Sequence, residues 1–86
     1  MKFKGTLTNI ETAVIHEVAG EWTVLTKGGV TYWPGWVEAS DGNDIELGNY
    51  TLTLANGSNG IINVFRSHPT SHAPVADFKG QGNPPE

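Results

Sequence analysis

The chain has 86 residues and contains no cysteine. This absence excludes disulfide bridges, thiolate nucleophiles and zinc sites with cysteine ligands. Long apolar runs are also missing: no segment approaches the ~18 residues of a membrane-spanning helix. The N-terminus, Met1–Thr6, is not followed by the apolar stretch of a signal peptide. We therefore expect a cytoplasmic protein without membrane contact.

Charge is scarce as well. Charged residues make up 16% of the chain, compared with about 25% in an ordinary globular domain. Nine acidic and five basic residues give a formal net charge of −4, and the bases do not cluster beyond Lys2 and Lys4. Nucleic-acid binding draws most of its affinity from Lys and Arg contacts to phosphates. Nucleic acid is therefore a disfavoured partner, and a nucleic-acid-binding small barrel is only an alternative function.

Glycine, by contrast, is plentiful. Eleven glycines divide the chain into short segments, a spacing typical of all-β domains. We expect an all-β fold in which five to seven short antiparallel strands form a small barrel or sandwich of the SH3-like or OB-like kind. Strand count and turn spacing do not decide the strand order.

The clearest element is a hairpin in the second half of the chain. Residues 50–54 alternate apolar and hydroxyl side chains, the pattern of a half-buried strand. A turn over residues 56–60 and a return strand over residues 61–65 complete the hairpin. Further strands are expected over residues 3–8, 22–26, 30–33 and 36–39, with turns at residues 27–29 and 41–44.

One segment allows two interpretations. Residues 9–19 contain no glycine or proline, and residues 8–11 fit the capping box that starts a helix. This interpretation gives an α+β fold with one helix. The β-branched Val14, Ile15 and Val18 favour a strand instead. Such a strand could pair with residues 22–26 across a tight turn at residues 19–20. We favour the strand.

The composition changes at residue 67. The last twenty residues hold four of the five prolines and few apolar side chains. We therefore expect a barrel-like domain over residues 1–66 and an extended tail over residues 67–86, which docks through Phe78.

The most informative cluster is aromatic. Tyr32 and Trp33 are adjacent, so on a strand their side chains point in opposite directions, and Trp36 follows closely. A single sheet that buries one face cannot cover all of these rings. One interpretation buries one ring in the core and places the other under the tail or against a bulge at Pro34. The other makes Tyr32, Trp33, Trp36 and Phe78 a surface that binds a partner.

Catalytic and metal-binding patterns are absent. His68 and His72 would lie on one face of a helix, but the prolines around them disfavour a helix, so we expect no metal site with His16. The acidic turn at residues 41–44 lacks the glycine and glutamate positions of a calcium loop. No serine lies in a nucleophile elbow. We expect no catalytic residue and no cofactor.

These observations predict a non-enzymatic protein-interaction or structural and assembly module, which uses its exposed aromatic residues and its C-terminal tail. The favoured partner is another copy of the chain. Besides the nucleic-acid-binding barrel, a second alternative is a small-ligand or carbohydrate binder that stacks its ligand on Trp33 or Trp36.

Overall fold

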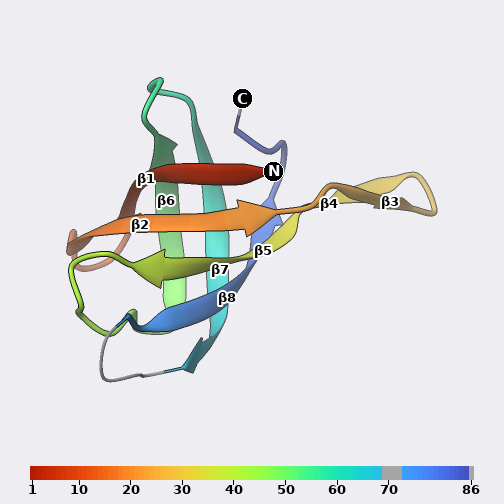
Figure 1. The fold of residues 1–86 in the computed structure, drawn as a ribbon. Coiled ribbons are helices and arrows are strands. Elements are labelled where there is room, and N and C mark those ends of the chain that lie inside the picture. Colours follow the sequence, from red (N-terminus) through yellow and green to blue (C-terminus); the bar gives the residue numbers. More distant parts are fainter. Residues whose placement is uncertain (69–72, 86) are drawn as a thin grey trace.

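A computed structural model describes residues 1–68 and 73–85 (Figure 1). The described residues form eight strands and no helix. The strands are β1 (Lys2–Asn9), β2 (Ile15–Trp22), β3 (Leu25–Lys27), β4 (Val30–Tyr32), β5 (Pro34–Ala39), β6 (Gly48–Leu54), β7 (Asn59–His68) and β8 (Val75–Gln81). The expected all-β fold is confirmed, and the alternative with a helix near residues 9–19 is wrong.

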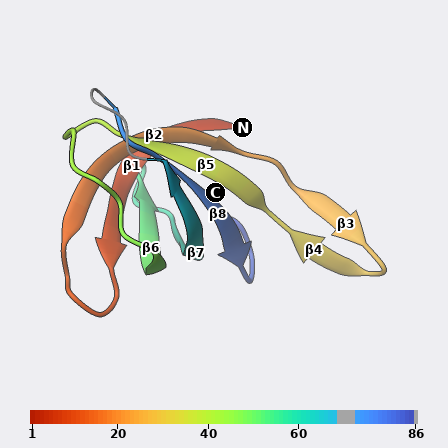
Figure 2. The same cartoon turned by 90° about the horizontal axis from the view of Figure 1, so that it is seen from below.

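Six strands close into an antiparallel barrel in the order β1–β2–β5–β8–β7–β6. The barrel closes between β1 and β6, where Leu7 pairs with Leu52. Closure removes the unpaired edges at which a sheet could recruit another chain. The remaining strands, β3 and β4, form a separate two-stranded sheet, which projects from the barrel in both views (Figures 1 and 2).

The core fills the barrel with alternate residues of its strands. On β6, Tyr50 and Leu52 are buried, whereas Thr51 and Thr53 lie on the other face. The predicted hairpin is confirmed, because β6 pairs with β7 from Gly48 to Thr53. The buried apolar residues are Phe3, Leu7, Val18, Trp22, Trp33, Val37, Ala39, Ile45, Tyr50, Leu52, Ile62, Val64, Ala76 and Phe78.

The segment after β1 is a turn followed by a long strand. Oδ1 of Asn9 accepts hydrogen bonds from the amides of Glu11 (2.8 Å) and Thr12 (3.0 Å), so its side chain holds a turn instead of starting a helix. β2 then continues to Trp22, and the turn expected at residues 19–20 is wrong. A Cβ at Gly20 would overlap the β5 backbone, so this glycine permits close strand approach.

The barrel extends beyond the boundary expected between residues 66 and 67. β7 continues to His68, and β8 pairs with β5 on one side and β7 on the other. The C-terminal segment is extended, as expected, but β8 is a strand of the barrel and not a separate tail. Ala76 and Phe78 are two residues apart, and both point into the core. This alternation places β8 in the barrel although the C-terminal segment has few apolar side chains.

The buried face of β6 yields a stability prediction. Leu52→Ala should lower the free energy of unfolding by about 2–5 kcal/mol, because the fully buried side chain leaves a cavity. Thr51→Ala, on the opposite face, is the matched control and should cost less than about 1 kcal/mol. Urea denaturation measures both. Equal, small losses would contradict the inward orientation of Leu52.

Candidate functional site

The four aromatic residues expected to form a partner surface divide into two pairs. Tyr32 and Trp36 are 48% and 39% exposed, whereas Trp33 and Phe78 have no exposed surface. Tyr32 and Trp33 do point in opposite directions, as the strand alternation requires. Only Tyr32 and Trp36 are therefore accessible to a partner in this fold.

Trp33 is a core residue at the barrel end nearest β3 and β4. Its ring meets the rings of Trp22 and Phe78 edge-on, with centroid separations of 5.8 and 5.9 Å. Its Nε1–H donates a hydrogen bond to the carbonyl oxygen of Gly82 (3.1 Å). Trp33 is thus buried and hydrogen-bonded, so of the two tryptophans expected to stack a ligand only Trp36 is accessible.

The hairpin of β3 and β4, here called the arm, continues the β2–β5 ladder beyond the barrel. β2 and β5 pair as far as Trp22 and Gly35. Within the arm, β3 pairs with β4 from Leu25 to Lys27. The two-residue loop between the strands, Gly28–Gly29, has φ angles of 58° and 78°. Two positive φ values fit the type I′ turn that matches strand twist. Figure 2 shows the arm standing away from the other strands.

The arm carries an apolar face. Leu25 pairs with Tyr32, and Val30 lies on the same side of the two-stranded sheet, since it is two residues from Tyr32. All three side chains are about half exposed. A pocket of about 490 Å³ adjoins this face, between the arm and residues 79–80 of β8. Neither Leu25 nor Val30 was expected at a partner surface, because the pattern of a short strand does not reveal that the neighbouring strands have ended.

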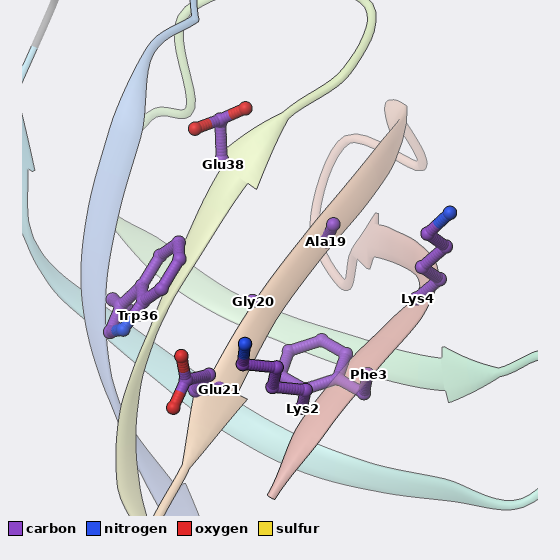
Figure 3. Close-up of a pocket in the computed structure, with 8 residues that line it drawn as sticks. All are labelled: Lys2, Phe3, Lys4, Ala19, Gly20, Glu21, Trp36 and Glu38. Atoms are coloured by element: carbon purple, nitrogen blue, oxygen red, sulfur yellow. The ribbon is translucent and has the colours of Figure 1, made fainter.

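A second surface surrounds Trp36. Eight residues line a pocket of about 470 Å³ on the outside of β1, β2 and β5 (Figure 3). We call it the Trp36 groove, and its residues are Lys2, Phe3, Lys4, Ala19, Gly20, Glu21, Trp36 and Glu38. Strand register brings them together: Lys2 pairs with Glu21, and Glu21 pairs with Trp36.

A third pocket, of about 440 Å³, lies beside the buried His16. Nδ1 of His16 is 3.2 Å from Oδ2 of Asp41, and Asp44 and Glu46 contribute to the lining. A histidine oriented by a carboxylate is an acid–base arrangement. Among the described residues that line the pocket, none is a serine or cysteine.

The hydroxyl groups of this third pocket are already engaged. Oγ1 of Thr12 accepts a hydrogen bond from the Val14 amide (3.3 Å), and the Tyr50 hydroxyl donates one to the Glu46 carbonyl oxygen (2.7 Å). The first contact lies in the segment between β1 and β2, and the second joins β6 to the loop that precedes it. Each of the two hydroxyl groups thus has a backbone hydrogen-bond partner. The absence of catalysis stays a prediction.

The histidines considered as metal ligands are not brought together where the structure describes them. His16 bonds Asp41, whereas Nε2 of His68 lies 3.0 Å from Oδ2 of Asp77 on the barrel surface. His72 lies outside the described residues. Over residues 1–68 and 73–85, no group of three potential ligands could hold a metal ion.

Comparisons with known proteins found no matching family model, no matching curated protein and no matching solved structure. Within the described part of the chain, no helix is long and apolar enough to cross a membrane. Functional inference for this chain therefore depends on the geometry of its own surfaces.

The buried Trp33 generates a second prediction. A Cβ at Gly80 would overlap the indole ring of Trp33, whereas a Cβ at Gly60 would lie 3.0 Å from its Cη2. Gly80→Ala should therefore cost more than about 3 kcal/mol and weaken the aromatic near-ultraviolet circular dichroism, since overpacking displaces the ring. Gly60→Ala, the matched control, should cost about 1–3 kcal/mol. A Gly80→Ala protein as stable as the parent would contradict the position of Trp33.

Proposed function

We propose that this protein is a non-enzymatic assembly module that associates with a second copy of itself through the arm. The observation that carries the proposal is the apolar face of Leu25, Val30 and Tyr32, which is half exposed on strands that project beyond the barrel. Tyrosine is enriched among the residues that contribute most to interface energy, and apolar side chains form the buried core of an interface.

The low stability expected of an isolated arm supports the presence of a partner. Each arm strand has three residues, all of them exposed, and the two strands pair only with each other. A two-stranded hairpin is marginally stable in water, and a third strand or a packing surface usually stabilises it. The arm also has the open strand edges that closure has removed from the barrel.

The β4 edge is better suited to pairing than the β3 edge. β4 consists of Val30, Thr31 and Tyr32, which are all strong strand formers without charge. β3 ends on Lys27, and a lysine at a sheet edge opposes pairing with another strand. We therefore assign the contact to the β4 strands of two copies.

The β4 strands of two copies can pair antiparallel about a two-fold axis that passes beside Thr31. In an antiparallel hairpin with a two-residue loop, the pair next to the loop, Lys27 and Val30, exchanges hydrogen bonds. The N–H and C=O of Thr31 therefore point toward the open edge. Two copies of Thr31 can exchange both bonds across the axis, which places Val30 of each copy beside Tyr32 of the other. Such an interface is isologous and closes on itself.

The third prediction concerns this dimer. Sedimentation should show a monomer at low micromolar concentration and a growing dimer fraction above it, because three paired residues per copy make a small interface. Thr31→Pro removes the outward N–H without disturbing the pairing to β3 and should abolish the dimer. Thr26→Pro, which removes the equivalent N–H from the β3 edge, is the matched control and should leave the dimer intact.

A second pair of variants tests the apolar face separately from the backbone. Tyr32→Ser should weaken association, whereas Ile61→Ser should not, since Ile61 is similarly exposed (44%) but lies on β7. A parent protein that stays monomeric at every concentration, or a Thr31→Pro protein that dimerises like the parent, would refute the proposal.

A further inference from the structure

The Trp36 groove is separate from the arm, because none of its lining residues lies between β2 and β5 in the chain. The indole of Trp36 forms one wall of the groove (Figure 3). Among the described residues it takes part in none of the ring contacts that hold Trp22 and Trp33 in the core. Because 39% of Trp36 is exposed, part of its ring surface is available to a ligand.

Small residues form the floor of the groove. Ala19 and Gly20 of β2 lie between the larger side chains of β1 and β5. The short side chain of Ala19, which lies between Lys4 and Glu38 in the strand register, leaves a space of about 470 Å³ beside the indole. This volume is within the range of ~300–1,000 Å³ for small-molecule sites. The barrel is closed at these strands, so a peptide could not add to the sheet here as a further strand.

Charged groups of both signs surround the indole. Lys2 and Lys4 come from β1, Glu21 from β2 and Glu38 from β5. None of the four belongs to an ion pair among the described residues, although Lys2 and Glu21 are register neighbours. Two ammonium groups and two carboxylates are thus free to bond a ligand.

The mixture of charges decides which ligand class fits. A phosphate or other strong anion meets Glu21 and Glu38, and a cation meets the two lysines, so each gains from one pair and loses to the other. A neutral polyhydroxyl ligand gains from both, because its hydroxyls accept from ammonium groups and donate to carboxylates in charge-assisted hydrogen bonds. The apolar C–H face of a sugar ring also packs on an indole plane.

We propose that the Trp36 groove is a binding site for neutral carbohydrate. A pyranose ring stacks on Trp36, and its hydroxyls bond to the lysines of β1 and to Glu21 and Glu38. The site is independent of the arm, so it adds a second binding activity to the proposed assembly module.

The fourth prediction tests this site with a panel of neutral disaccharides built from glucose, galactose, mannose or N-acetylglucosamine. At least one of them should shift the Nε1–H resonance of Trp36 in a saturable way in the intact protein. Trp36→Ala should weaken that binding by about tenfold or more, through the lost stacking surface. Ala19→Leu should weaken it as well, because the larger side chain fills the floor.

Phe65→Ala is the matched control, since Phe65 is 41% exposed but lies on β7 outside the groove; it should leave the affinity unchanged. The Thr31→Pro protein should bind the sugar like the parent, which separates this site from self-association. A panel without any saturable shift would overturn the proposal. So would saturable binding by zwitterionic glycine betaine or by a lysine-containing peptide but by none of the sugars.

Discussion

The indole of Trp33 occupies the interior at the barrel end from which the arm projects, and this placement constrains the residues on every side of it. The ring needs the space of a missing side chain at Gly80 and packs edge-on against Trp22 and Phe78. Its hydrogen bond to Gly82 ties the segment after β8 to the same end of the barrel. The three strands β2, β5 and β8 are therefore held around one side chain.

Burial of Trp33 also sets the orientation of both candidate surfaces. Because side chains alternate along an extended chain, an inward Trp33 places Tyr32 outward on the arm. Val37 is again inward, so Trp36 faces outward above β5. One anchored residue thus determines the apolar face of the arm and the aromatic wall of the Trp36 groove. A shift of one residue would bury Tyr32 and Trp36 and expose Trp33.

The sequence predicted what depends on local patterning. Alternation over residues 50–54 was sufficient for the hairpin of β6 and β7, and adjacency was sufficient for the opposite orientations of Tyr32 and Trp33. It did not reveal which of the two is buried, because that depends on the space at Gly80, 47 positions away in the chain. The Trp36 groove likewise depends on the register between β1, β2 and β5. The place of β8 in the barrel depends on its pairing with both β5 and β7. Such long-range pairings leave little signal in a single sequence.

The position of β8 has a consequence for how the chain folds. β8 follows every other barrel strand in the sequence, yet it lies between β5 and β7 and pairs with both. During synthesis the earlier strands can form hairpins, but β5 and β7 each keep an open edge until β8 leaves the ribosome. Closure therefore joins distant parts of the chain late, which slows folding and leaves an interval of exposure to aggregation. The pairing of β8 is therefore the step that ends the exposure of the β5 and β7 edges.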